Sequence, residues 1–151
     1  MFVSRRCSER RFFLRPCKAT RSTVLYLVAE AANRFGVKVH ALCVMSNHLH
    51  MVITDTEGRY PEFLCQVHKL IAKTLNAHWG RWENLWASEQ TSVVELTDEA
   101  SVLDKIAYTL ANPASAHLVA SIDEWPGASS WGALDGRVME LRRPGWFFDA
   151  K

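Results

Sequence analysis

The chain has 151 residues, of which 48% are hydrophobic, and a formal net charge of +2, which together predict one globular domain with its own core. It lacks both the roughly 18 consecutive apolar residues of a membrane span and the apolar segment of a signal peptide, so we expect a cytoplasmic protein with no membrane partner. The four cysteines have neither CxxC nor zinc-finger spacing, which favours free thiols over disulfides or a structural metal.

Positive charge is concentrated at the N-terminus. Residues 1–21 contain seven basic side chains and one acidic side chain, so the remainder of the chain is net acidic. Such a basic arm indicates a polyanionic partner, for which a nucleic-acid backbone is the obvious candidate. The alternative is a charged strand that only keeps one edge of a sheet soluble.

The first quarter of the chain begins with strand patterns and continues as a helix. Residues 2–4 and 11–16 favour short strands, and Pro16 closes the second of them. Apolar residues at helical spacing then predict a helix over 20–34, and Gly36 stops it.

The next segment has the pattern of a hairpin followed by a long helix. Two apolar runs, 37–45 and 48–54, predict antiparallel strands joined at residues 46–47. A turn at 55–58 leads to a helix that runs from Pro61, which fits its first turn, to about Trp79.

The last predicted elements are a fourth strand over 93–96 and a third helix that follows at once. Thr97 or Asp98 supplies the N-terminal cap of this helix, and Pro113 terminates or kinks it. Its expected core stripe consists of Val102, Leu103, Ile106, Ala107 and Leu110.

This order of elements predicts an α+β fold. We expect a ferredoxin-like split βαβ antiparallel sheet with helices packed on one face, and a further helix after the fourth strand. Residues 1–120 should form this domain, and residues 121–151 should form a tail, rich in Trp, Pro and Gly, that packs on it. The aromatic ending at 147–148 suggests a truncated form of a longer protein.

Two histidines lie two residues apart inside the apolar run that includes residues 48–54. Because strand side chains alternate between faces, His48 and His50 project from one face while Leu49 points to the other. Imidazole is the commonest metal ligand, so the pair predicts part of a metal site. Half-buried strand histidines without any metal show the same spacing.

The third helix carries a second row of residues beside its apolar stripe. Asp104, Tyr108 and Asn112 lie at i, i+4 and i+8, and therefore on one face. The amide oxygen of Asn112 could be a third metal ligand, with the phenol of Tyr108 beside the metal as a nucleophile for phosphodiester cleavage. Lys105 could stabilise the phenolate. The alternatives are a tyrosine packed at the edge of the core and an exposed lysine.

Several segments together resemble one known family. They are Val44-Met45-Ser46-Asn47-His48-Leu49-His50 with Asp55, Tyr108-Thr109-Leu110-Ala111-Asn112-Pro113, Arg5-Arg6-Cys7, Phe13-Leu14-Arg15-Pro16 and Trp125-Pro126-Gly127. With these segments the chain resembles the REP-associated tyrosine transposases over nearly its whole length. These are HUH-type single-strand endonucleases related to single-tyrosine insertion-sequence transposases. His117 stands where relatives commonly have glycine.

The resemblance implies a role for each matching residue. His48, His50 and Asn112 match the ligands of a divalent metal, magnesium or manganese, and Tyr108 matches the nucleophile. The family cuts single-stranded DNA near the small hairpins of repetitive extragenic palindromes, without ATP. Cleavage leaves a 5′-phosphotyrosine link and a free 3′-hydroxyl that can join another strand. The implied partner is single-stranded or hairpin DNA, and the enzyme could act as a monomer or a homodimer.

DNA contacts are expected from cations and from aromatic side chains, because single strands are held by both. The candidate cations are Arg5, Arg6, Arg10, Arg11, Arg15 and Lys105. The candidate stacking residues are Trp82, Trp86 and His78, although a loop tryptophan is more often a lid over a core. Two other functions are compatible with the sequence: a domesticated hairpin-DNA-binding protein that does not cut, and a metallohydrolase that uses water on small phosphodiesters.

Overall fold

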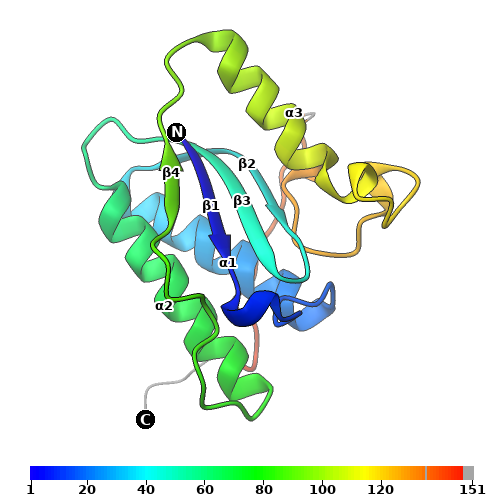
Figure 1. The fold of residues 1–151 in the computed structure, drawn as a ribbon. Coiled ribbons are helices and arrows are strands. Elements are labelled where there is room, and N and C mark those ends of the chain that lie inside the picture. The colour runs from blue at the N-terminus through cyan, green and yellow to red at the C-terminus, as the bar shows by residue number, and fades with distance from the viewer. Residues whose placement is uncertain (135, 148–151) are drawn as a thin grey trace.

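Four strands form one antiparallel sheet in the computed structural model, which describes residues 1–134 and 136–147 (Figure 1). They are β1 (Phe2–Arg6), β2 (Lys38–Val44), β3 (His48–Thr54) and β4 (Ser92–Val94). Their order in the sheet is β2-β3-β1-β4, which confirms the predicted ferredoxin-like α+β fold. The strand predicted over 11–16 is wrong: local bonds such as Arg11 N–H to Ser8 O hold that segment in turns.

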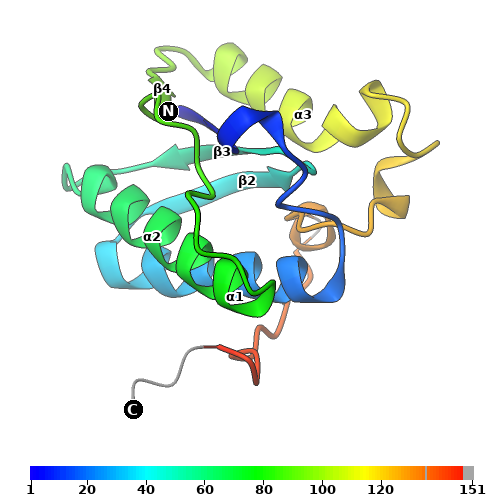
Figure 2. The same ribbon diagram turned by 60° about the horizontal axis from the view of Figure 1, so that its bottom comes forward.

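Helices cover both faces of this sheet. They are α1 (Lys18–Phe35), α2 (Tyr60–His78) and α3 (Glu99–Ser115). Helices α1 and α2 pack together beneath the sheet, whereas α3 lies across the opposite face against β2 and β3 (Figure 2). The prediction that the helices share one face is therefore wrong for α3.

The reason is that β2 and β3 carry apolar residues on both faces. Leu42 and Met51 face α1 and α2 in the main core, whereas Ala41 and Val52 pack with Leu110 of α3. A sheet with two apolar faces has to be covered on both sides to remove that surface from water.

The core stripe of α3 is narrower than its sequence suggests. Leu110 is buried, and Val102 and Ile106 pack beside it, one turn apart along the helix. Leu103 is 59% exposed and Ala107 is exposed, so the prediction that they belong to the core is wrong. Thr109 and Pro113, on the other side of Leu110, are also buried, so the buried side of α3 lies around Leu110 and away from Leu103 and Ala107.

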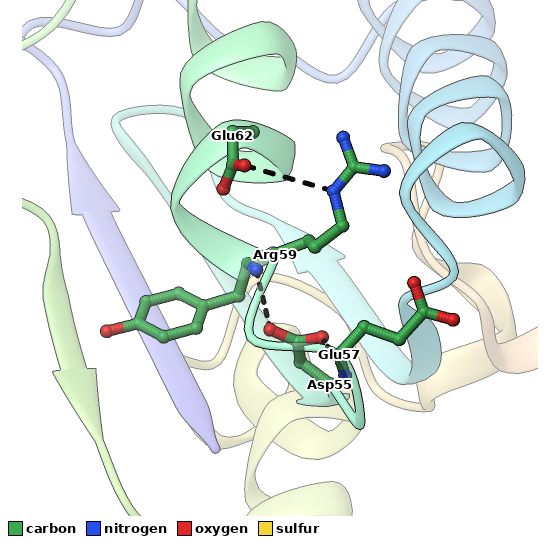
Figure 3. A network of polar contacts seen from close by, with 5 residues as sticks. Asp55, Glu57, Arg59 and Glu62 are labelled. Atoms are coloured by element: carbon green, nitrogen blue, oxygen red, sulfur yellow. Dashed lines mark hydrogen bonds and ion pairs between the residues drawn. The ribbon is translucent and has the colours of Figure 1, made fainter.

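Asp55 organises the turn between β3 and α2. Its carboxylate accepts hydrogen bonds from the backbone N–H groups of Glu57 (3.1 Å) and Tyr60 (2.6 Å), as Figure 3 shows. Tyr60 is the first residue of α2, so Asp55 satisfies one of the otherwise free amides at the start of that helix. Arg59 and Glu62 add an exposed ion pair at 3.8 Å.

The described part of the segment after residue 120 runs along the free edge of β2. The Trp125 indole is buried and donates to Val44 O (3.2 Å), and Val44 N–H donates to Ala128 O (2.9 Å). Farther along, the Trp146 indole donates to Thr23 Oγ1 of α1 (3.2 Å). The predicted boundary at residue 120 stays a prediction, and residues 135 and 148–151 of the predicted tail lie outside the described residues.

Two further expectations from the sequence concern the cysteines and membrane-spanning helices. All four cysteines are free, as their spacing predicts. In the described part of the chain, no helix has both the length and the apolar character needed to cross a membrane.

The backbone at His117, just after α3, has the left-handed conformation, with φ of 55°. For a residue with a Cβ this conformation costs roughly 1–2 kcal/mol, which glycine avoids. Glycine loses more conformational entropy on folding, however, and this offsets part of the gain. His117→Gly is therefore expected to raise the free energy of unfolding by about 1 kcal/mol, measured by urea denaturation. His117→Ala keeps the Cβ and serves as the control. Equal stabilisation by both variants would show that the imidazole, and not the backbone, is responsible.

His68 of α2 makes folding stability depend on pH. Burial, together with the charge of Arg5, lowers the pKa of His68 to about 4, from an ordinary value near 6.5. The fold favours the neutral imidazole, so this contribution is complete above pH 6.5 and is lost as the pH falls through 4. We expect a loss of about 3 kcal/mol from this group between neutral pH and about pH 4. His68→Leu should flatten the pH dependence in urea titrations, and an unchanged dependence would refute the assignment.

Candidate active site

The two histidines of β3 lie side by side on the face that α3 covers. In the antiparallel register, Ser4 of β1 is opposite His50 and Arg6 is opposite His48. The two imidazole centroids are 4.7 Å apart, and His50 is only 7% exposed. The alternation of strand side chains is therefore as the sequence predicts, with Leu49 buried in the opposite core.

Both imidazoles are held in the neutral form. Burial lowers the pKa of His50 to about 4, helped by repulsion from His48 when that ring is protonated and by the charge of Arg6. Burial and Arg6 also lower the pKa of His48. A neutral imidazole keeps a nitrogen lone pair, which is the form that binds a metal ion. The pair is thus in the correct protonation state for ligation at neutral pH.

Asn47 fixes the ring of His48. Its Oδ1 lies 2.7 Å from His48 Nδ1, and its Nδ2 donates to Arg10 O at 3.2 Å. Since the amide oxygen can only accept, Nδ1 carries the proton and the lone pair is left on Nε2. This is the arrangement by which an outer partner orients a metal-binding histidine. The sequence contains Asn47 within its motif, but only the structure gives it this role.

Helix α3 brings Tyr108 to the histidine pair. The Tyr108 ring lies 5.6 Å from the His50 ring, edge-on, and remains 47% exposed. Phe2 of β1 stacks on His50 at 5.2 Å and meets Tyr108 edge-on at 5.9 Å. A tyrosine from a helix and a histidine from a strand thus share one aromatic neighbour, Phe2. Nothing in the sequence identifies Phe2, because its place depends on the pairing of β1 with β3.

Lys105 lies over this aromatic cluster. Its Nζ is 5.2 Å from the centre of the Tyr108 ring and 5.7 Å from that of Phe2. It also pairs with Asp104 at 3.6 Å. The cation therefore lies over the face of the Tyr108 ring, within the range of a cation–π contact. Asp104 itself is exposed and contributes to the site only through Lys105.

Asn112 lies one turn after Tyr108 and is half-buried. Its side-chain amide makes no hydrogen bond within residues 1–134 and 136–147, so its oxygen is available as a ligand. No group of three or more His, Cys, Asp or Glu side chains suited to a metal ion occurs among the described residues. The predicted ligand set, two histidines and one amide, therefore depends on Asn112. Imidazole and amide oxygen together suit manganese or magnesium, and imidazole favours manganese of the two.

The known proteins that this chain matches are solved structures. Neither any family model nor any curated protein matches the chain. A REP-associated tyrosine transposase, solved bound to a REP hairpin, superposes with a TM-score of 0.61 at 14% sequence identity. The match covers 99% of this chain and 91% of the other. The chain has the fold of this transposase.

A second solved structure agrees. It is a protein from Deinococcus radiodurans R1, provisionally named a transposase, with a TM-score of 0.50 and 17% identity over 69% of this chain and 83% of that one. The two structural neighbours support the family resemblance seen in the sequence. At these identities they establish the shared fold, and the chemistry has to be argued from the residues.

Within this transposase fold, the basic residues predicted to hold DNA divide into three groups. Arg6 and Lys105 lie at the histidine and tyrosine centre. Arg5 points to the other side of β1, where its guanidinium donates to Ala87 O (2.9 Å) and Glu89 O. These hydrogen bonds hold the loop before β4 in place. Arg10 and the remaining predicted arginines line a separate cleft.

The predicted stacking residues occupy different environments. Trp86 is half-buried, packs on His68 and donates to its carbonyl at 2.8 Å, so it is a lid over the core. His78 packs between Trp79 and Trp146. Trp82 is 96% exposed and remains open to solvent. Of the three, only Trp82 has a free ring face of the kind that stacks on a base.

Proposed function

We propose that the protein is a metal-dependent single-stranded DNA endonuclease and strand transferase of the REP-associated tyrosine transposase family. It would cleave near REP-type hairpins through a 5′-phosphotyrosine on Tyr108. The observation that carries this proposal is the meeting of the half-exposed Tyr108 ring with the buried His50 ring at 5.6 Å. A packed core tyrosine would need no neutral histidine pair beside it.

Each residue of the centre would have a different role in cleavage. The Tyr108 oxygen attacks the phosphorus, the bond from phosphorus to the 3′ oxygen breaks, and that oxygen leaves and takes up a proton. The 5′ phosphate then remains on Tyr108, and a 3′-hydroxyl can reverse the step or join another strand. Arg6, opposite His48, offers positive charge to the phosphate, and Lys105 stabilises the phenolate.

The metal would be held by His48, His50 and Asn112. A divalent ion bound there would polarise the phosphate and stabilise the negative charge that develops on its oxygens. Asn47 orients His48 for this task through its Oδ1. Lowered pKa values favour the neutral form of both imidazoles at neutral pH, and that of His50, about 4, means that this ligand is lost to protonation only in clearly acidic solution, where activity should fall.

The test is incubation of the protein with labelled single-stranded hairpin DNA and Mn²⁺, followed by denaturing gel electrophoresis. We expect a labelled product that migrates with the protein and disappears on protease treatment. Binding of the hairpins without any covalent product would instead support the hairpin-binding protein that does not cut. Cleaved DNA without a protein link would support a water-dependent hydrolase.

A further inference from the structure

A cleft of about 670 Å³ lies beside the histidine and tyrosine centre but outside it. One wall is the segment between β1 and α1, which includes Arg10 and Phe12. The other wall is the end of α2 and the residues after it, Trp79 and Arg81. The centre described above uses none of these side chains, and it meets this wall only through the bond from Asn47 to the Arg10 carbonyl.

Positive charge dominates the cleft. Four arginines line it, against one acidic residue, Glu9. Glu9 pairs with Arg11 at 2.8 Å, which neutralises one of the four. Within the described ranges, Arg10 and Arg15 have no acidic partner. The cleft therefore presents uncompensated positive charge, which attracts a phosphate-bearing ligand.

The aromatic rings of the cleft are not equivalent. The Arg81 guanidinium lies 3.3 Å from the centre of the Phe13 ring, and the Arg15 guanidinium lies 5.0 Å from that of Trp79. These two rings are thus already covered by cations. Phe12 is 66% exposed and has no ring or cation partner among residues 1–134 and 136–147. The cleft therefore offers one exposed aromatic ring together with arginines that have no acidic partner. Sites that bind a single-stranded base combine these two features, the ring for the base and the cations for the phosphates.

Two buried donors add to this picture. Trp79 Nε1 and Arg81 Nε are both shielded from solvent, and neither has a hydrogen-bond acceptor in the described structure. Buried donors without acceptors are costly, so a small shift that gave them a phosphate or base oxygen would be favourable. Both belong to residues that line the cleft.

We propose that this cleft binds an unpaired nucleotide next to the DNA hairpin. The base stacks on Phe12, and the adjoining phosphates lie against Arg10 and Arg15. The inference rests on the proposed function for the identity of the ligand as single-stranded DNA. It assigns the stacking role to Phe12 and not to Trp82, which does not line the cleft.

The cleft is also connected to the histidine centre. Asn47 donates to Arg10 O on the cleft wall and, through Oδ1, holds His48 Nδ1. The same wall is fixed to the β2–β3 turn by Cys7 N–H to Asn47 O (2.7 Å) and Leu14 N–H to Ser46 O (2.9 Å). A nucleotide that orders the Arg10 wall would therefore also order the residue that orients His48.

The experiment is a fluorescence anisotropy titration in EDTA, so that no cleavage occurs. The probes are a labelled DNA hairpin with an unpaired thymidine tail and the same hairpin without the tail. Phe12→Ala should weaken binding of the tailed hairpin by roughly tenfold or more and leave the blunt hairpin within about twofold. Trp82→Ala, which removes an exposed aromatic residue that does not line the cleft, should change neither. Circular dichroism checks that both variants fold.

Two results would overturn the proposal. One is a loss by Trp82→Ala that matches or exceeds the loss by Phe12→Ala. The other is an equal effect of Phe12→Ala on both hairpins. Failure of the proposed cleavage activity is a separate result. In that case the protein would form no covalent product in Mn²⁺ but would still bind the tailed hairpin more tightly than the hairpin without a tail.

Discussion

Replacement of Tyr108 by phenylalanine is expected to abolish the covalent DNA–protein product, with a fall in rate of at least about 10³-fold. The phenol oxygen is the proposed nucleophile, and phenylalanine lacks only that atom. The ring contacts with His50 and Phe2 need no hydroxyl, so the fold and the affinity for hairpin DNA should be unchanged. Denaturing gels give the product yield, and anisotropy gives the affinity.

The matched control is Tyr60→Phe, which removes the same atom from a tyrosine on the other side of the sheet, at the start of α2. It should cleave at the normal rate. If Tyr108→Phe still cut DNA without forming a protein link, water would be the nucleophile and the tyrosine mechanism would be excluded.

Replacement of His50 by alanine is expected to remove most of the affinity for Mn²⁺. Loss of an outer partner of a metal ligand typically costs 10- to 100-fold in affinity, and loss of a ligand should cost more. Asn47→Ala, which removes the bond to His48 Nδ1 together with the bond to Arg10 O but no metal ligand, should fall in the 10- to 100-fold range. Isothermal titration calorimetry with Mn²⁺ measures both, and the covalent product should decline in the same order.

His40→Ala is the control for these variants. His40 is also a half-buried strand histidine, but it lies on β2, and its Nε2 is already bonded to Thr54 Oγ1 at 2.8 Å. It should bind Mn²⁺ with normal affinity. Equal losses in His40→Ala and His50→Ala would mean that the histidines of β3 do not form the metal site.

Local patterns in the sequence were sufficient for the three helices and for four of the five predicted strands, the segment 11–16 being the exception, and for which side chains share a face. Alternation along a strand placed His48 and His50 on one face, and helical spacing placed Tyr108 and Asn112 on one row, because both follow from backbone periodicity alone. Asp98 was identified as a possible cap and does accept from Ser101 N–H at 2.8 Å. These features depend on residues close in the chain, which sequence reasoning handles well.

Long-range relations decided the rest. The side of the sheet on which α3 packs, the place of Phe2 between His50 and Tyr108, and the diversion of Arg5 to loop carbonyls depend on strand register and on which apolar face remains uncovered. Charge alone could not distinguish Arg5 from Arg6, since neighbours on one strand point to opposite faces.

The sequence by itself thus determined the ferredoxin-like order of elements and the residue types of the proposed nuclease centre. The tertiary structure decided that α3 covers the histidine face and brings Tyr108 to His50. It also showed that Phe12, and not a tryptophan, lies open in a basic cleft. The physical reason is that backbone periodicity determines on which face of its helix or strand a side chain lies. Which other element packs against that face is determined by the burial of apolar surface between segments far apart in the chain.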